Sequence, residues 1–461
     1  MAMNLFEAVS EQRITGILEE AAGEPSEREL QEILAKGAEK NGLELYEVAR
    51  LLNVESEAGL AKMFALSSKI KRGIYGNRLV WFAPLYLSNY CKNACAYCGF
   101  SALNTSIERK RLSLEEIAEE TRALIRMGHK RLLLESGEDA EKAPIDYIVD
   151  AIRTVYATKE RKGEIRRVNV NIAATTTENY RKLKAAGIGT YQLFQETYHR
   201  PTYERVHKGL KRDYERQLTA HCRAFEAGID DYGVGVLLGL YDYKFDVLAL
   251  IAHAQWMDEK YGVGPHTISV PRIRPAAGIS FEPPFPVSDR DFLKIIAVYR
   301  IAVPYTGMII STRERPEVRE KAFAIGISQA SAGSRTSPGG YSKKSMVGEQ
   351  FALSDHRSLH EVLADVCAKG FLPSFCTACY RSKRTGQAFM KLAKTGQINR
   401  LCTPNALLTF KEFLMDYATP ELKEEGEELI RRMTSEVEET KREEFLKRLK
   451  RIEAGERDLF F

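Results

Sequence analysis

The sequence predicts an α/β protein built on a parallel (β/α)8 TIM barrel, with an N-terminal helical extension and a C-terminal helical domain. The chain has 461 residues, 44% of them hydrophobic, which is enough for a barrel with appendages. Short apolar runs alternate with amphipathic segments about eight times over roughly 250 residues, the pattern of a parallel barrel. An open doubly wound sheet is the alternative. The predicted domains cover residues 1–75, 76–345 and 346–461.

The N-terminal extension is predicted to be helical. Ser26 and Glu29 form a capping box, and Leu30 and Ile33 follow at helical spacing. A second amphipathic helix is expected from Leu45.

Eight apolar runs are the expected barrel strands, and the helical patterns between several of them close with a glycine. In the third run, alternation directs Asn169 and Asn171 into the barrel, and Val168 and Val170 toward the helices. The expected strands cover residues 79–87, 130–136, 167–174, 190–196, 230–239, 266–274, 307–312 and 324–329. No strand is expected after residue 345, where helices are predicted over 356–370, 387–396 and 421–455.

The charge is nearly balanced, with 68 basic and 63 acidic residues. This balance gives no reason to expect a nucleic-acid or membrane partner. No apolar run is long enough to span a bilayer, and the N-terminus lacks the pattern of a secretory signal. We therefore expect a cytoplasmic protein, whose clustered cysteines serve metal ligation or catalysis in preference to disulfides.

The first cysteine cluster comprises Cys91, Cys95 and Cys98, directly after the first expected strand. Loops that follow barrel strands line the catalytic face. Three thiolates can ligate three irons of a 4Fe–4S cubane, which leaves the fourth iron free to bind S-adenosylmethionine. A structural zinc site is the alternative, but it would need a fourth nearby ligand.

Several polar residues near this loop are candidate cofactor contacts. Tyr97 precedes the last cysteine by one residue, the place of an aromatic beside the adenine in radical S-adenosylmethionine (radical SAM) enzymes. The segment after the second strand resembles the one that binds the methionyl amino group in that superfamily, although it could be only a turn. The candidates are Tyr97, Ser136, Gly137, Glu138, Asn171, Glu196 and Arg216.

A second cluster combines Cys376 and Cys379 in a CxxC with Cys402, which follows after 22 residues (402 − 379 − 1). A zinc ribbon would need another cysteine or histidine pair. A second 4Fe–4S cluster, again with one open iron, fits better. Cys222 and Cys367 are isolated within helical patterns and are interpreted as packing residues.

Beyond these motifs, nearly the whole chain resembles the HydG family of radical SAM tyrosine lyases, which mature FeFe-hydrogenase. The resemblance includes LYLSNYCKNACAYCGF, RRVNVNIAATTTENY, GIGTYQLFQETYHRPTYE, VGPHTISVPRIRP and PSFCTACYRSKRTG. The related 2-iminoacetate synthases of thiamine thiazole biosynthesis (ThiH) share the barrel and tyrosine cleavage. They lack the C-terminal CxxC…C domain, which is present here.

The resemblance implies that L-tyrosine is cleaved to p-cresol and dehydroglycine. Dehydroglycine then becomes CO and cyanide, which assemble an Fe(CO)2(CN)–cysteine unit for the H-cluster. It also implies two 4Fe–4S clusters, the second carrying an extra iron bridged by L-cysteine and held by His266. That histidine begins the sixth expected strand, at the end of the barrel opposite the catalytic loops. A channel through the barrel would then join the two sites.

The resemblance further implies a cation for the tyrosine carboxylate, and Arg313 at the end of strand seven is the candidate, assisted by Ser331 and Ser328 after strand eight. Reduced flavodoxin or ferredoxin is the implied electron donor, and other hydrogenase maturases are the implied partners. Two other functions stay open, namely a 2-iminoacetate synthase that stops at tyrosine cleavage and a non-enzymatic iron–sulfur carrier.

Overall fold

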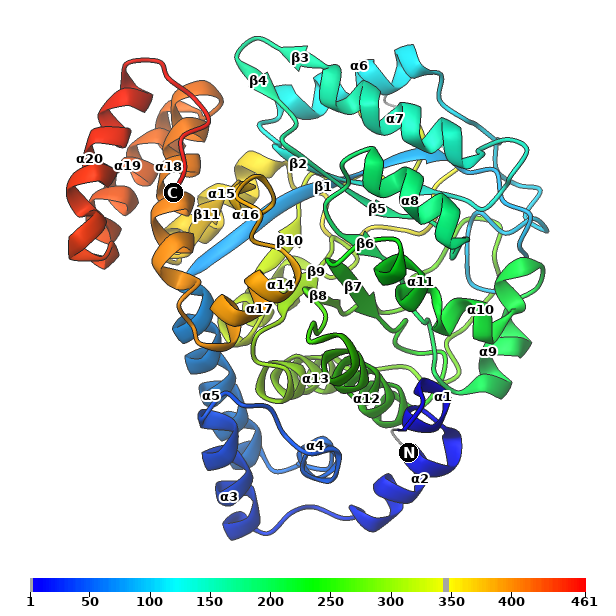
Figure 1. The fold of residues 1–461 in the computed structure, drawn as a ribbon. Helices are drawn as coiled ribbons and strands as arrows, with labels where there is room; N and C mark the ends of the chain where they lie inside the picture. Colours follow the sequence, from blue (N-terminus) through cyan, green and yellow to red (C-terminus); the bar gives the residue numbers. More distant parts are fainter. Residues whose placement is uncertain (1–2, 343–347) are drawn as a thin grey trace.

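The computed structural model describes residues 3–342 and 348–461. Eight parallel strands close into a barrel, because β10 pairs with β9 on one side and with β1 on the other (Figure 1). The predicted barrel is therefore confirmed. Its strands are β1 (Arg78–Ser88), β2 (Arg131–Ser136), β5 (Arg167–Asn171), β6 (Tyr191–Gln192), β7 (Tyr232–Gly235), β8 (Thr267–Ser269), β9 (Gly307–Ile310) and β10 (Gln329–Ser331).

Helices surround the barrel and bury their apolar faces on it. Ser113 caps one of them in a capping box with Glu116, and Pro316 begins another at a position that needs no backbone donor. The helices are α6 (Leu114–Arg126), α7 (Ile145–Ala157), α8 (Thr177–Ala185), α9 (Arg200–Val206), η1 (Leu210–Arg212), α10 (Tyr214–Leu218), α11 (Ala220–Glu226), α12 (Tyr243–Tyr261), α13 (Asp289–Ala302) and α14 (Pro316–Ile325). A short hairpin joins β3 (Lys159–Glu160) and β4 (Gly163–Glu164).

The N-terminal helices pack beneath the barrel, with α4 against α12 and α5 against α13 (Figure 1). They are α1 (Leu5–Ala8), α2 (Glu11–Glu20), α3 (Glu27–Ala38), α4 (Leu45–Leu52) and α5 (Glu57–Tyr75). Ser26 caps α3 as predicted, because its hydroxyl accepts from the Glu29 amide. The Glu29 carboxylate does not complete the capping box. It accepts two hydrogen bonds from Arg50 instead, at 2.6 and 2.7 Å.

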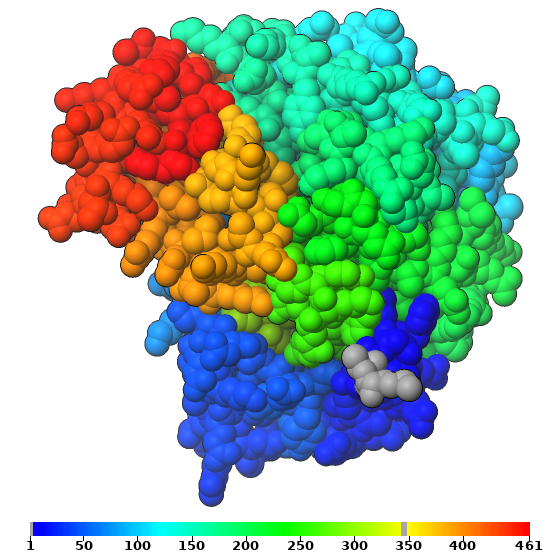
Figure 2. Space-filling view, in the orientation of Figure 1, coloured from blue at the N-terminus to red at the C-terminus, as the bar shows by residue number. Residues whose placement is uncertain are grey.

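The C-terminal helices form a lobe against one side of the barrel (Figure 2). They are α15 (Leu359–Ala368), α16 (Ala378–Arg381), α17 (Gly386–Lys394), α18 (Asn399–Asp416), α19 (Pro420–Met433), η2 (Thr434–Glu436) and α20 (Glu439–Glu453). The helix expected over residues 421–455 is interrupted near Thr434, whose hydroxyl donates to the Ile430 carbonyl. Val437 is buried in this break and anchors the turn.

Two expectations about strands are wrong. Strand eight lies at 329–331 and not at 324–329, because α14 continues to Ile325. The run is buried in either conformation, so apolar content does not separate helix from strand there. Strands also do not end near 345, since β11 (Leu372–Ser374) pairs with the start of β1. It contains Pro373, which an edge strand tolerates and which weakens a strand pattern.

The three-domain division stays a prediction. Its first boundary falls between the end of α5 at Tyr75 and the start of β1 at Arg78. Its second, at 345/346, lies outside the described residues.

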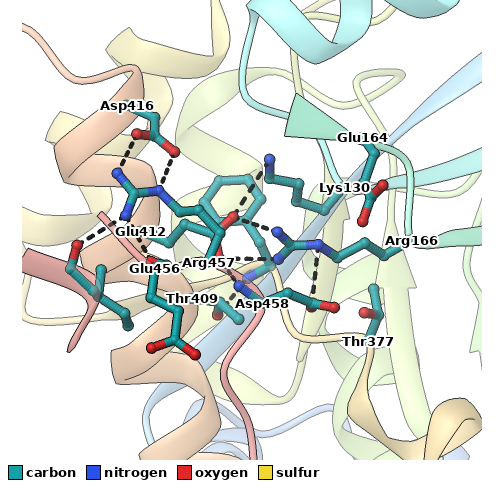
Figure 3. Close-up of polar contacts among 12 residues, drawn as sticks. Lys130, Glu164, Arg166, Thr377, Thr409, Glu412, Asp416, Glu456, Arg457 and Asp458 are labelled. Atoms are coloured by element: carbon teal, nitrogen blue, oxygen red, sulfur yellow. Dashed lines mark hydrogen bonds and ion pairs between the residues drawn. The ribbon is translucent and has the colours of Figure 1, made fainter. Parts of the chain in front are cut away.

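A buried ion-pair network fastens α18 to the barrel (Figure 3). Arg166 donates to both carboxylate oxygens of Glu412, at 3.0 and 2.6 Å, and Lys130 lies 3.5 Å from the same carboxylate. The three side chains are at most 4% exposed. Burial alone would raise the pKa of Glu412, but the charges and hydrogen bonds of Arg166 and Lys130 hold it below its usual value.

Replacement of Glu412 by alanine is expected to lower the free energy of unfolding by about 3–5 kcal/mol, because buried Lys130 loses its counter-charge and buried Arg166 keeps only the more exposed Asp458. Denaturant unfolding followed by circular dichroism measures the change. Glu453→Ala is the control, because that carboxylate pairs with Lys411 but is 51% exposed, and surface pairs contribute less than about 1 kcal/mol. Equal losses in both variants would contradict a large contribution of the buried network to the free energy of unfolding.

Candidate active site

Two cavities at opposite ends of the barrel contain candidate site residues. The larger, of about 210 Å³, opens at the carboxyl ends of the barrel strands. Its lining includes Cys91, Cys95 and Cys98, together with residues from the ends of β1, β2, β5 and β10. Eleven of the residues predicted for the first site meet here. They are the three cysteines, Tyr97, Ser136, Gly137, Glu138, Asn171, Glu196, Arg313 and Ser331.

Arg109 holds the loop that carries the three cysteines. Its guanidinium donates to four backbone carbonyls, those of Asn89, Phe100, Ser101 and Asn104, at 2.6–3.0 Å. Gly99, directly after the last cysteine, has no room for a side chain, because a Cβ there would lie 2.3 Å from a backbone oxygen of Glu349. The loop is therefore fixed from both sides.

The three thiols fit a cationic iron cluster. Burial raises the pKa of Cys98 to about 11 and also raises that of Cys95. As isolated groups these thiols would stay protonated, whereas a coordinating metal ionises them. Gly137 brings its backbone against Cys91, since a Cβ on it would lie 3.1 Å from the Cys91 Cβ. The Gly137 carbonyl accepts from the Ser136 hydroxyl at 3.0 Å, which uses one of its two lone pairs.

Two predicted cofactor contacts are oriented by neighbours. The Tyr97 hydroxyl lies 2.8 Å from His207 Nε2, and its ring packs edge-on against Phe281. Asn171 donates to Glu135 at 3.3 Å. Both side chains therefore present a defined surface to the cavity.

Two acidic candidates are already paired. Glu138 accepts from Asn93 and from Arg216, both at 2.6 Å, so its carboxylate ties the cysteine loop to α10. Arg216 does not line the cavity and contacts it only through Glu138. Glu196 accepts from Lys211 at 2.6 Å. It also has a φ of +69°, a left-handed conformation that is costly for a residue with a Cβ and is often found at functional sites.

Of the cations among the described residues that line this cavity, Arg313 has the weakest contacts with other side chains and backbone groups. Its guanidinium lies 3.3 Å from the centre of the Phe351 ring. Within the described ranges, its side chain makes one hydrogen bond, a 3.5 Å contact to the Arg272 carbonyl. Arg272 itself is bound by Glu314 and Asp289, so it is not available to a ligand.

The two serine predictions separate. Ser331 ends β10 and lines the cavity. Ser328 precedes β10, so the expected position after strand eight is wrong. Its hydroxyl is buried and accepts from the Met308 amide at 3.1 Å, away from the cavity. The misplacement follows because that strand begins at Gln329, five residues later than expected (329 − 324).

Glu135 is a proton-holding group in the cavity wall. Burial raises its pKa from the ordinary 4.5 to about 8. At this group the folded chain therefore holds a proton that the unfolded chain has lost between about pH 4.5 and 8. It follows that the contribution of Glu135 to the free energy of unfolding falls as the pH rises through this window.

The variant Glu135→Gln is expected to lack that contribution, because the amide does not titrate, so the free energy of unfolding of the wild type minus that of the variant should fall as the pH rises from about 4.5 to 8. Urea unfolding at a series of pH values measures it. The control is Glu141→Gln, whose carboxylate is 77% exposed, and which should retain the wild-type slope. An unchanged slope in Glu135→Gln would show that another group causes it.

The smaller cavity, of about 50 Å³, lies at the opposite end, among the residues that begin the strands. Cys376, Cys379, Cys402 and His266 all line it, so the structure brings these four candidate residues together. Arg78 donates to the Cys402 sulfur at 3.2 Å. Burial raises the pKa of Cys379 to about 12, so this thiol also needs a cation to ionise. The donor set fits a second iron–sulfur cluster.

Residues missed by sequence reasoning reach the two cavities from distant segments. Lys211, Gln350 and Phe351 line the first, and no local pattern marks them. Asp231 lies beside His266 at the second site. Their adjacency could have been inferred, because both precede neighbouring parallel strands.

Among the described residues, no three His, Cys, Asp or Glu side chains converge on one point as ligands of a single ion do. Cubane ligands bind separate irons and are spaced more widely. No helix in the described ranges is long and apolar enough to cross a membrane.

Comparison with known proteins places these sites in a family. The profile of the Radical SAM superfamily matches residues 85–253, and that of the Biotin and Thiamin Synthesis associated domain matches 269–372. The 2-iminoacetate synthase of Escherichia coli (strain K12) is 35% identical over 325 residues, which are 70% of this chain and 84% of the relative.

Two solved structures are similar over nearly the full length. A crystal structure of HydG, a maturase of the [FeFe]-hydrogenase, is 55% identical with a TM-score of 0.96, covering 98% of this chain and 100% of the other. The FeFe-hydrogenase maturase HydG from Carboxydothermus hydrogenoformans is 40% identical with a TM-score of 0.86, covering 97% and 100%. The chain therefore belongs to the radical SAM superfamily and, within it, to the HydG family of hydrogenase maturases.

Proposed function

We propose that the protein cleaves L-tyrosine to p-cresol and dehydroglycine, and that it converts dehydroglycine to CO and cyanide for an Fe(CO)2(CN)–cysteine precursor of the H-cluster. The observation that carries the proposal is the presence of two cysteine trios at opposite ends of one barrel, each lining its own cavity. An enzyme that stops at tyrosine cleavage would not need the second trio. The similarity to 2-iminoacetate synthase and to HydG supports both halves.

At the first site, a 4Fe–4S cluster with bound S-adenosylmethionine supplies a 5′-deoxyadenosyl radical when reduced. Cys91, Cys95 and Cys98 are the proposed ligands. The Gly137 carbonyl and the Tyr97 ring then hold the cofactor's amino group and adenine. The remaining proposed contacts to cofactor and substrate come from Ser136, Glu138, Asn171, Glu196, Arg313 and Ser331.

Arg313 orients tyrosine by binding its carboxylate, and the apolar wall formed by Phe82, Leu133 and Ile309 limits water behind it. A guanidinium matches a carboxylate with two parallel hydrogen bonds, so it sets both position and angle. The amino group of tyrosine would then be presented toward the cysteine loop.

At the second site, Cys376, Cys379 and Cys402 are the proposed ligands of an auxiliary 4Fe–4S cluster. An extra iron, which becomes part of the product, would be held by His266 and a free L-cysteine. Reduced flavodoxin or ferredoxin is the proposed electron donor, and another hydrogenase maturase is the proposed recipient of the product.

Replacement of His266 by alanine is expected to leave p-cresol formation near the wild-type rate and to abolish the iron–carbonyl product. His266 lies at the far end of the barrel from the tyrosine site, so its loss removes an iron ligand only. Chromatography of p-cresol and infrared spectroscopy of bound CO measure the two outcomes. A normal carbonyl yield would contradict the assignment.

The proposal is tested by mixing the reduced protein with tyrosine and S-adenosylmethionine and assaying p-cresol, CO and cyanide together. All three products are expected. The alternative, a 2-iminoacetate synthase, is favoured by the 35% and 34% identical relatives of that name, and it predicts p-cresol without CO or cyanide. Absence of 5′-deoxyadenosine would instead indicate an iron–sulfur carrier.

A further inference from the structure

Asp231 is a buried carboxylate at the second site that the proposed chemistry does not use. It directly precedes β7 and is 2% exposed. One of its oxygens, Oδ2, lies 3.1 Å from His266 Nδ1. The backbone holds the two residues at this distance, because the His266 amide donates to the Tyr232 carbonyl at 2.9 Å.

The same oxygen accepts a hydrogen bond from the hydroxyl of Tyr380, the residue after Cys379. That hydroxyl also lies 3.0 Å from Thr190 Oγ1, and the Arg167 guanidinium stacks 3.2 Å from the centre of the tyrosine ring. Tyr380 therefore reaches from the CxxC loop into the base of the barrel. Asp231 joins this loop to the strand pair that carries the histidine.

These contacts indicate which edge of the imidazole is free. With the carboxylate 3.1 Å from Nδ1, the tautomer that carries its hydrogen on Nδ1 places that hydrogen beside the negative charge, and Nε2 keeps its lone pair. Throughout residues 3–342 and 348–461, no group hydrogen-bonds Nε2 of His266. The ring packs 4.1 Å from the Phe389 ring, which fixes its plane. His266 lines the cavity together with the three cysteines, and Asp231 does not.

We propose that Asp231 and Tyr380 are positioning residues of the second site. Asp231 holds His266 with Nε2 toward the cavity, and Tyr380 ties that carboxylate to the cysteine loop. The separation between the histidine and the thiols is thereby fixed. The inference rests on the proposed role of His266 as an iron ligand. Carboxylates that orient a ligating histidine typically contribute 10–100-fold to metal affinity.

The test measures the binding of Fe²⁺ and does not depend on turnover. The wild type, His266→Ala, Asp231→Asn and Tyr380→Phe are prepared with both clusters and titrated anaerobically with Fe²⁺. Electron paramagnetic resonance follows the auxiliary cluster in each. His266→Ala is expected to lose the extra iron. Asp231→Asn should weaken Fe²⁺ binding by about 10–100-fold, and Tyr380→Phe by less.

Asp230→Asn is the matched control, because it changes the same residue type at the adjacent position. Its carboxylate is 37% exposed and contacts Lys184 and Thr385, not His266. Its Fe²⁺ affinity should equal that of the wild type. A loss of Fe²⁺ affinity in Asp230→Asn would show that changes anywhere in this segment disturb the site, and it would remove the support for a specific contact of Asp231.

The outcomes separate this inference from the proposed function. If His266→Ala keeps the extra iron, the histidine is not its ligand and the proposed function loses that step. If His266→Ala loses the iron but Asp231→Asn binds it at full affinity, the positioning role is overturned. If Asp231→Asn loses the auxiliary cluster itself, its Fe²⁺ affinity cannot be compared with that of the wild type, and Tyr380→Phe provides the test. That variant removes only the hydroxyl and keeps the ring against Arg167. Unchanged affinity in Tyr380→Phe would then overturn the inference.

Discussion

The variant Cys95→Ala is expected to form no detectable 5′-deoxyadenosine and no p-cresol. A cubane with an open iron needs three thiolates from the chain, and Cys95 is the most buried of the three in this loop. No other described cysteine lines the first cavity, so none can substitute. We expect a loss of at least 10³-fold, which corresponds to about 4 kcal/mol of transition-state stabilisation.

Electron paramagnetic resonance tests the same variant independently of activity. The signal that S-adenosylmethionine perturbs should vanish, while the signal of the auxiliary cluster persists. Cys376→Ala should give the reverse pattern. Cys222→Ala is the control, because this cysteine lies in α11 outside both cavities, and it should retain both signals. A single signal in the wild type would refute the assignment of two clusters.

Replacement of Arg313 by alanine is expected to raise the KM for tyrosine by about 10²-fold. Hydrogen bonds to a charged group contribute roughly 1.5–3 kcal/mol, and a bidentate pair makes two of them. The Arg313 guanidinium already stacks on Phe351 and has only one long protein hydrogen bond, so little is lost when it turns to a ligand. Arg313→Lys should fall between alanine and wild type, because it keeps the charge but not the planar fork.

Steady-state kinetics with varied tyrosine measure this effect, with kcat reported separately. A rise in KM at nearly constant kcat indicates lost ground-state binding. Arg315→Ala, two residues away and 61% exposed, should leave both parameters unchanged. If KM were unchanged in Arg313→Ala, the carboxylate would have to bind elsewhere in the cavity.

The predictable part of the fold is the part encoded by local pattern. The first cysteine trio lies within one short loop, and the CxxC of the second trio is equally local, whereas its third cysteine, Cys402, lies in α18. The barrel was visible because β1, β2 and β5 are continuous buried runs. The sixth-strand position of His266 also followed from order along the chain.

What sequence reasoning missed depends on tertiary contacts. Tyr380 and Asp231 are 149 residues apart in the chain, and Gln350 reaches Cys98 across 252. No periodicity records such pairs. Ser328 was misplaced because α14 and β10 are both buried, so apolar content did not locate the boundary between them.

One strand has a consequence for how this protein can change. Alternate residues of β1 line the two cavities, with Arg78 and Val80 at one end and Phe82, Pro84 and Tyr86 at the other. A single inserted or deleted residue between Val80 and Phe82 would turn one set outward, because side chains alternate along a strand. Point substitutions can therefore vary either site alone, whereas a change in the length of β1 must disrupt one of them. The two sites therefore depend on the length of one and the same strand.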